Sequence, residues 1–239
     1  MTDQSAWEAR LYDWHNEHRL RAQQADVLYW QTTVPAATRV AVLGGGTGRI
    51  ASPLCEQGRM VIALDASSAR LRRMARLPRL HPVCGDFRAL PLTICFDTAI
   101  FPYSSFQLLI SVADRRRALE EAARVLVPGG LVHIDVSGNF DTKLPTDWFP
   151  SLVAPCGAAE VAEWERRTLA QDHIVIDKSF QSQGRILTEA REKWAFLRVL
   201  GLETELELAG FELTEISRGY GPDSATHRLI YHGRRRDGE

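Results

Sequence analysis

Clustered cysteines are missing from this sequence. Its four cysteines, Cys55, Cys84, Cys95 and Cys156, lie far apart, and Cys84 and Cys95 fall in or beside apolar runs that predict buried strands. A structural zinc site needs clustered ligands, and a disulfide framework needs an oxidising compartment. The spacing therefore predicts reduced thiols in a cytoplasmic protein, with neither a metal site nor disulfides.

Long apolar runs and an excess of positive charge are missing as well. The longest runs, such as Leu131–Val136, are far shorter than the ~20 residues that span a bilayer, and residues 1–14 lack the basic start and apolar stretch of a signal peptide. A formal net charge of −1 provides no basic field for phosphates. We interpret Arg234–Arg236 as a solvated tail. These absences argue against a membrane or nucleic-acid partner.

Length and composition predict one globular domain. A chain of 239 residues, 45% hydrophobic and 25% charged, can bury one large core and carry a lid, but it is too short for two substantial domains. We expect a single domain over residues 1–239. Its parts are an N-terminal helical cap (1–35), a core (36–137 and 200–235) and a substrate lid (138–199).

Short β-rich runs separated by helical stretches predict an α/β fold. Alternating strands and helices form a parallel sheet with helices on both faces. Only residues 218–226 separate the last two runs, which is too short for a crossover helix and predicts an antiparallel hairpin. The sequence thus predicts a seven-stranded, mostly parallel sheet with an antiparallel last strand, from the runs 39–44, 60–65, 81–86, 96–101, 131–136, 211–217 and 227–233.

Two segments flank or interrupt this pattern. Residues 3–31 place charged and aromatic residues at helical spacing, which predicts the helical cap. Residues 138–195 break the strand-helix rhythm; we expect two or three strands within 160–180 and a helical stretch around 190–200. An insertion after the fifth strand lies above the carboxyl ends of the sheet, where a lid would cover a substrate.

The strongest motif is a glycine-rich turn directly after the first strand. Glycines at Gly44, Gly46 and Gly48 allow a tight turn and the close approach of a ligand, and the helix that follows adds its positive dipole end. A nucleotide-like ligand is implied; tight strand-to-helix packing is the alternative. A dinucleotide fingerprint needs glycine where Arg49 stands, and a P-loop needs a Gly-Lys-Ser/Thr ending, so an NAD-type oxidoreductase and a P-loop enzyme are both disfavoured.

Acidic residues end the next two strands. Asp65 is placed to accept hydrogen bonds from two ribose hydroxyls, and a helix-capping role is its alternative. Asp86 can accept from an adenine amino group while Phe87 covers the ring; a capping aspartate beside a core phenylalanine is the alternative here. Together the three strand ends predict one adenosine-sized site.

These motifs, with FDTAIF at 96–101 and the turn RVLVPGG at 124–130, resemble those of the class I S-adenosylmethionine (SAM)-dependent methyltransferases. The resemblance covers residues 38–137 and the terminal hairpin, and it is strongest to small-molecule members such as sugar and amino-acid N-methyltransferases. It implies a Rossmann-like fold that binds SAM across the carboxyl ends of strands one to four and releases S-adenosylhomocysteine (SAH). The implied cofactor contacts are Tyr12, Gly44, Gly46, Gly48, Asp65, Ala66, Asp86, Phe87 and Pro102.

The loop at 101–107 resembles the one that small-molecule members place beside the methyl group, and this implies a catalytic position for Tyr103. It lacks the leading Asn or Asp of the Asn/Asp-Pro-Pro-Tyr/Phe motif of base and glutamine methyltransferases, which argues against a nucleic-acid substrate. One departure concerns the methionine end of SAM. Most members have Asp or Glu where this chain has Val42, so a bound water or a polar group from the cap would have to substitute.

Methyl transfer from a sulfonium is a direct displacement, so the enzyme mainly aligns its substrates in a water-poor site. An oxygen acceptor would benefit from a general base, whereas an amine need only be delivered unprotonated. Asp135 and Asn139, at and just beyond the end of the fifth strand, are candidates by topology, and a turn-capping role is the alternative for Asp135. Among the histidines, His15 is our catalytic candidate, and His18, His133 and His173 are further candidates; for each, a surface or core role is the alternative.

We expect methyl transfer to a nitrogen or oxygen of a small-molecule acceptor, such as a secondary metabolite. The alternative is a protein that binds SAM without transferring its methyl group, and Val42 is the feature that keeps it open. Trp148, Phe149 and Trp164 could wall an apolar acceptor pocket or form the lid's own core. The sequence leaves open whether the chain forms a homodimer.

Overall fold

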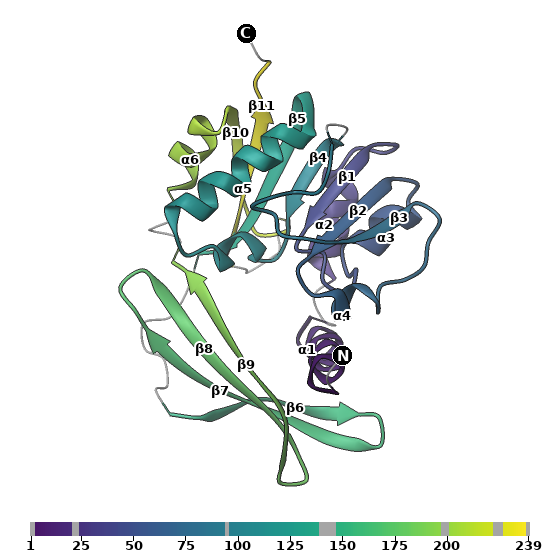
Figure 1. Ribbon diagram of the computed structural model, residues 1–239, viewed down its shortest axis with the longest axis vertical. Coiled ribbons are helices and arrows are strands. Elements are labelled where there is room, and N and C mark those ends of the chain that lie inside the picture. The colour runs from purple at the N-terminus through teal and green to yellow at the C-terminus, as the bar shows by residue number, and fades with distance from the viewer. Residues whose placement is uncertain are drawn as a thin grey trace.

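The protein contains two separate β-sheets (Figure 1). One is seven-stranded, with the order β10-β11-β5-β4-β1-β2-β3, and the other is four-stranded, with the order β6-β7-β8-β9. The computed structural model describes residues 3–20, 24–93, 96–138, 147–196, 201–221 and 227–237.

The seven-stranded sheet confirms the predicted fold. Strands β1 to β5 pair in parallel, whereas β11 runs antiparallel to both β5 and β10. The fifth strand starts earlier than its apolar run at Leu131, because Leu126 already pairs with Phe96. The strands are β1 (Arg39–Leu43), β2 (Met60–Asp65), β3 (Leu80–Cys84), β4 (Phe96–Phe101), β5 (Leu126–Ser137), β10 (Phe211–Arg218) and β11 (Arg228–Arg235).

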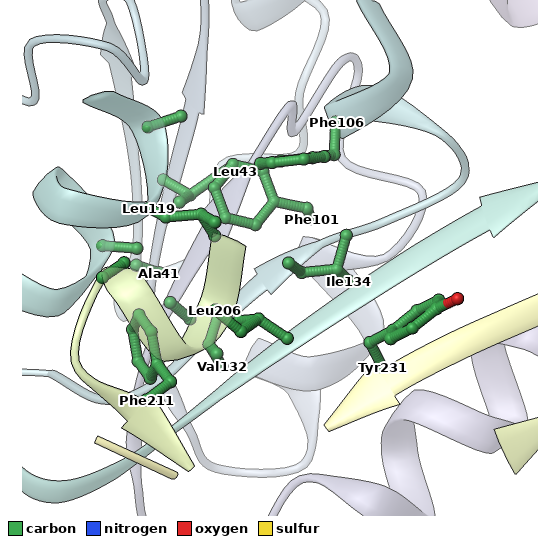
Figure 2. Close-up of a cluster of buried hydrophobic side chains, with 14 of the residues drawn as sticks. Ala41, Leu43, Phe101, Phe106, Leu119, Val132, Ile134, Leu206, Phe211 and Tyr231 are labelled. Carbon is green, nitrogen blue, oxygen red and sulfur yellow. The ribbon is translucent and has the colours of Figure 1, made fainter. Parts of the chain in front are cut away.

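Helices cover both faces of this sheet. On one face Leu119 of α5 (Val112–Val125) and Leu206 of α6 (Leu202–Leu208) belong to a fully buried cluster that also holds Phe101 and Phe106 (Figure 2). On the other face the buried Trp30 packs in a second cluster. That face is covered by α2 (Ala25–Thr33) and α3 (Ala51–Glu56). The remaining core helices are α4 (Ser68–Leu71) and the short 3-10 helix η1 (Ser105–Leu108).

The predicted lid is the antiparallel four-stranded sheet, made of β6 (Phe149–Cys156), β7 (Ala159–Leu169), β8 (His173–Ser182) and β9 (Arg185–Ala195). The helix expected around 190–200 is wrong for 190–195, which belong to β9. These residues pair with β8 along their length, as Trp194 does with Ile174, and this pairing holds them in an extended conformation. Successive side chains of such a strand point to opposite faces of the sheet. Residues 197–200 lie outside the described part of the chain.

The predicted cap consists of two helices with different partners. Helix α1 (Asp3–Leu20) lies between α4 of the core and β6 of the lid (Figure 1). Its Leu11 and Trp14 are buried against lid residues such as Phe180, and the Trp14 Nε1 donates to the Pro155 carbonyl at 2.9 Å. Helix α1 therefore joins the lid to the core, whereas α2 belongs to the core.

The predicted burial of the cysteines is only partly correct. Cys55 is buried, but Cys84 is exposed because β3 is an edge strand of the sheet; Cys95 lies outside the described residues. No described helix is both long and apolar enough to cross a membrane. The described residues also include no group of three or more His, Cys, Asp or Glu side chains arranged to hold a metal ion.

Candidate functional site

A cavity of about 510 Å³ lies between the carboxyl edge of the core sheet, α1 and the lid. It brings together six residues predicted from the sequence: Tyr12, His15, Gly44, Asp65, Pro102 and Tyr103. Six other predicted residues lie at the carboxyl ends of β1, β2, β3 and β5 but do not line it: Gly46, Gly48, Ala66, Asp86, Phe87 and Asp135.

The glycine turn forms the floor of this cavity. Gly44 has φ +93° and packs so closely on η1 that a Cβ added to it would lie 2.5 Å from the Cβ of Ser105. Gly46 has φ +55° and faces the cap, where a Cβ would lie 2.8 Å from the Tyr12 hydroxyl. Both positions need a left-handed backbone and the absence of a side chain. Tyr12 thus lies directly over the turn.

Asp65 connects the glycine turn to α4. Its Oδ2 accepts from the Gly46 amide at 2.9 Å and its Oδ1 from the Ser67 amide at 2.8 Å, and the residue lines the cavity. An ionised carboxylate offers about four acceptor sites, so two hydrogen bonds leave capacity for ligand hydroxyls. Ala66, which follows it, is exposed. Asp65 therefore caps the backbone on both sides, which is the alternative role, and it also reaches the cavity, as ribose binding requires.

Asp86 and Phe87 occupy the places expected of them at the end of β3, but both have protein partners. Arg88 donates to both carboxylate oxygens of Asp86, at 2.5 to 3.0 Å, and these hydrogen bonds lower the pKa of that carboxyl. Phe87 packs edge-on against Phe101, with ring centroids 5.7 Å apart. The contacts match the packing alternative for Phe87, and an adenine role for Asp86 requires Arg88 to share the carboxylate.

Asp135 holds the loop that follows β4. Tyr103 and Ser104 have φ of +46° and +66°, and both their amides donate to Asp135, one to Oδ2 and one to the main-chain carbonyl. The carboxylate also accepts from the Tyr220 hydroxyl at 2.7 Å and pairs with Arg228 at 2.6 Å. Non-glycine residues in this region cost about 1–3 kcal/mol each. The fully buried Asp135 thus fixes a strained loop.

The ring of Tyr103 lies between two guanidinium groups, those of Arg49 and Arg228, at 5.2 and 4.7 Å from its centroid. Partial desolvation raises the pKa of its phenol although both cations oppose this, so the hydroxyl is protonated near neutral pH. Arg49 in turn pairs with Asp26 of α2 at 2.6 Å. Arg49 and the uncharged Val42 both line the cavity, so a cation is present where the usual acidic residue is missing.

His15 is joined to the lid. Its Nδ1 lies 2.6 Å from Oε2 of Glu163, whose side chain is 0% exposed. Burial by itself would raise the pKa of Glu163, but the hydrogen bond from His15 and the nearby charges, including Lys178, outweigh burial and lower it. The cap thus places the His15 imidazole at the cavity wall, and the lid places a buried, ionised carboxylate behind it.

The other histidines do not line the cavity. His133 is buried in the core sheet with its Nδ1 2.8 Å from Nδ1 of His232, and burial together with His232 lowers the pKa of His133 to about 3. His18 and His173 bond to neighbours in their own segments. Asn139 lies outside the described residues.

The lid wall consists of alternate residues of β8 and β9, as expected for one face of a sheet. Trp194 supplies an aromatic surface to this wall. Trp148, Phe149 and Trp164, for which a pocket wall and a lid core were the two alternatives, do not line the cavity, and Trp148 is 41% exposed. The alternating wall residues are Ile174, Ile176, Lys178, Phe180, Thr188, Ala190, Glu192 and Trp194; Arg191 of β9 and Glu165 and Arg167 of β7 also line the cavity.

Charged residues of β7 were missed by sequence reasoning. Glu165 is 3% exposed and forms ion pairs with Arg167 at 2.6 Å and with Arg19 of α1 at 3.5 Å. The signal was present, because Glu163, Glu165 and Arg167 recur with a period of two and must share one face of a strand. From the sequence alone, a strand face with several charged residues is predicted to be exposed to solvent, because some of the residues that pair with them come from distant segments.

Known proteins show the following similarities. Residues 40–130 match a family model described as a methyltransferase domain. The chain is 25% identical over 189 residues to a cypemycin N-terminal methyltransferase from Streptomyces sp, covering 78% of this chain and 77% of that protein. It is 32% identical over 204 residues to an uncharacterised 37.1 kDa transposon protein of Streptomyces fradiae, covering 79% of this chain and 55% of that protein.

A similar solved structure is that of a sugar N-methyltransferase from Streptoalloteichus sp. The TM-score is 0.76 at 19% sequence identity, and the match covers 95% of this chain and 93% of that one. At this identity the similarity concerns the fold, and it includes the lid as well as the core.

Proposed function

The chain is a SAM-dependent methyltransferase whose residues 40–130 match the methyltransferase-domain model, and from that premise we propose that it methylates an amine nitrogen of a small-molecule secondary metabolite. The observation that carries the proposal is the shared cavity, which has the glycine turn and Asp65 on its core side and His15 on its cap side. The choice of nitrogen is supported by the names of the cypemycin N-terminal methyltransferase and the sugar N-methyltransferase.

The residues on the core side fit SAM. When bound, SAM supplies an electrophilic methyl group on its sulfonium. The remaining acceptor capacity of Asp65 suits the two ribose hydroxyls. Gly44 packs on Ser105 without a side chain and, with Gly45, presents the turn to the cavity. Tyr12 covers the turn, and the Arg70 guanidinium stacks 4.0 Å above its ring. Tyr12 would therefore close the site from above.

Arg49 is our candidate for the methionine end. It lines the cavity beside the turn, and Asp26, which is 3% exposed, holds its guanidinium through one Nη1 contact. A guanidinium has five N–H donors and matches a carboxylate well. Where Val42 provides no acid for the ammonium group, Arg49 would bind the carboxylate of the same amino acid.

On the acceptor side the chain positions the amine, excludes water and takes up a proton. Trp194 and Ile174 form an apolar wall, and the loop held by Asp135 brings Tyr103 to the same cavity. An ammonium nitrogen has no lone pair, so the acceptor must lose a proton before it can attack. His15 lines the cavity and is the group that would receive this proton.

A panel of acceptors tests the proposal. Purified protein and SAM are incubated with amino sugars, amino acids and short peptides, and with hydroxyl compounds of matched shape, and products are identified by mass spectrometry. We expect methylated amines together with SAH, and a fall of about 100-fold in the rate at which both form in His15→Gln. Methylation confined to the hydroxyl compounds would contradict the nitrogen assignment, and SAH binding with no methylated product from any class would contradict the proposal as a whole.

A further inference from the structure

The contact between His15 and Glu163 joins two segments that are far apart in the sequence. We propose that Glu163 is a positioning residue that holds His15 in the Nδ1–H tautomer and so presents Nε2 to the cavity as the proton acceptor. The inference rests on the proposed function for the role of His15. It adds a lid residue to which neither the motifs nor the resemblance assigned a role.

The geometry defines which nitrogen carries the hydrogen. Oε2 of Glu163 lies 2.6 Å from Nδ1 of His15, and the glutamate side chain is 0% exposed. An ionised carboxylate can only accept, so Nδ1 must be the donor and Nε2 is left with its lone pair. Hydrogen bonds of this charge-assisted kind are short and strong. The contact therefore selects both the tautomer and the orientation of the ring.

Lys178 adds to the hydrogen bond from His15 in keeping the carboxylate ionised against the effect of burial. Its Nζ lies 3.9 Å from Oε1 of Glu163 and 3.3 Å from Oε2 of Glu192. Oε1 of Glu163 is buried and accepts no hydrogen bond from the described residues, so this cation is its close partner. A nearby positive charge favours the charged form of a carboxyl group. Glu163 can then remain an acceptor before the proton reaches His15 and a counter-ion afterwards.

The packing of α1 on the lid brings the two residues together. Leu11 and Trp14 are buried against the lid, and His15 follows them on the same helix with 21% of its side chain exposed. His173 also contacts a carboxylate at 2.6 Å, that of Asp172, but it does not line the cavity. His15 thus combines a buried carboxylate partner with access to the cavity.

The proton balance is simple. One N–H bond of the acceptor ammonium breaks, its electron pair stays on nitrogen, and the proton forms an Nε2–H bond on His15. The resulting imidazolium is neutralised by Glu163, which is not itself protonated, as in other histidine-carboxylate pairs. His15 returns the proton to water through its exposed edge.

The tautomer can be measured directly on the full chain. Long-range ¹H–¹⁵N spectra of labelled protein at about pH 8.5 distinguish the two neutral tautomers, and the His15 signals are assigned by their loss in His15→Gln. We expect Nδ1–H in the wild-type protein, a shift toward Nε2–H in Glu163→Leu and no change in Glu189→Gln, an exposed control on β9. Nε2–H in the wild type would overturn the proposal, even if Glu163→Leu does not fold.

Kinetics on an amine identified by the panel give a second test. In Glu163→Gln we expect kcat to fall about 100-fold, within the range that general base catalysis contributes, with KM changed less than threefold and the low-pH limb of the kcat profile displaced. Adding His15→Gln should cost nothing more, because the two residues act as a unit. Additive losses would contradict the proposal.

SAH titration separates this inference from the proposed function. Glu163→Gln should bind SAH within twofold of the wild type, since Glu163 does not line the cavity. Failure of the wild-type protein to bind SAH would refute the proposed function while leaving the tautomer assignment intact. An Nε2–H tautomer in a protein that binds SAH and methylates amines would refute the role of Glu163 alone.

Discussion

The two sides of the cavity are built by different means. The core side depends on backbone conformation, with Gly44 in a left-handed turn and Tyr103 in a strained loop, and with carboxylates that bind main-chain amides. The lid side depends on side chains that pair across strands and helices, such as Glu163 with His15 and Glu165 with Arg167. The core side therefore requires particular backbone conformations, whereas the lid side requires pairs of oppositely charged side chains.

This difference suggests a division of labour. A turn that only glycine can adopt tolerates little change and suits a ligand common to many enzymes. Paired side chains on strands can be exchanged without disturbing the backbone, and they suit an acceptor that differs between enzymes. Changes on the core side should therefore affect SAH binding, and changes on the lid side should affect turnover and stability.

The largest effect is expected at the glycine turn. Gly44→Ala would place a Cβ 2.5 Å from the Ser105 Cβ at a φ of +93°, so we expect about 100-fold weaker SAH binding by calorimetry. Gly58→Ala is the matched control, with φ +90° and nothing within 4 Å. It should lose some stability from backbone strain but bind SAH normally. Equal losses in both variants would show that strain, and not packing at the site, decides binding.

Acid should affect the core before the lid. The folded-state pKa of His133 is about 3 and the unfolded value is about 6.5, so the unfolded chain binds more protons below that value and stability falls as pH falls. We expect a loss of about 2 kcal/mol in the unfolding free energy between pH 8 and pH 5, measured by urea denaturation. The loss should shrink in His133→Phe. An unchanged pH dependence would exclude the buried histidine pair as its cause.

Arg49 provides a smaller effect that is specific to one end of the ligand. We expect Arg49→Gln to bind SAH about tenfold more weakly, ~1.4 kcal/mol, because the carboxylate loses its partner. Binding of methylthioadenosine, which has no amino-acid group, should not change. If both ligands lose the same affinity, Arg49 only supports the fold around Asp26.

The smallest effect is expected on the lid side. Glu165→Gln leaves Arg19 and Arg167 without their shared carboxylate, and we expect a loss of about 1 kcal/mol in unfolding free energy, because both arginines are about one-third exposed and partly screened. SAH affinity should stay within twofold. A tenfold loss of SAH binding would mean that the two sides of the cavity are not independent.

The core could be predicted from the sequence because its determinants are local. Each parallel strand is a short apolar run, and the glycine turn and Asp65 follow directly from strand ends. The hairpin followed from the length of one loop. Asp135 was located at the correct strand end, but its partners Arg228 and Tyr220 come from distant segments, so its anchoring of the Tyr103 loop could not be anticipated.

The lid could not be predicted to the same extent because its determinants are not local. The prediction of a helix at residues 190–195 was wrong, because their strand conformation depends on pairing with β8. Glu163 is a buried carboxylate only because α1 brings His15 to it from the other end of the chain. Single-strand alternation shows which residues share a face, but it does not show what covers that face.

Calorimetric titration with SAH, comparing the wild type with Asp65→Ala, tests the central claim most directly. Asp65 is the side chain that connects the turn to the cavity, through hydrogen bonds at 2.8 and 2.9 Å. We predict saturable binding that Asp65→Ala weakens at least tenfold, ~1.4 kcal/mol. Absence of SAH binding by the wild type, or equal affinity in the two proteins, would contradict a SAM site at this strand end.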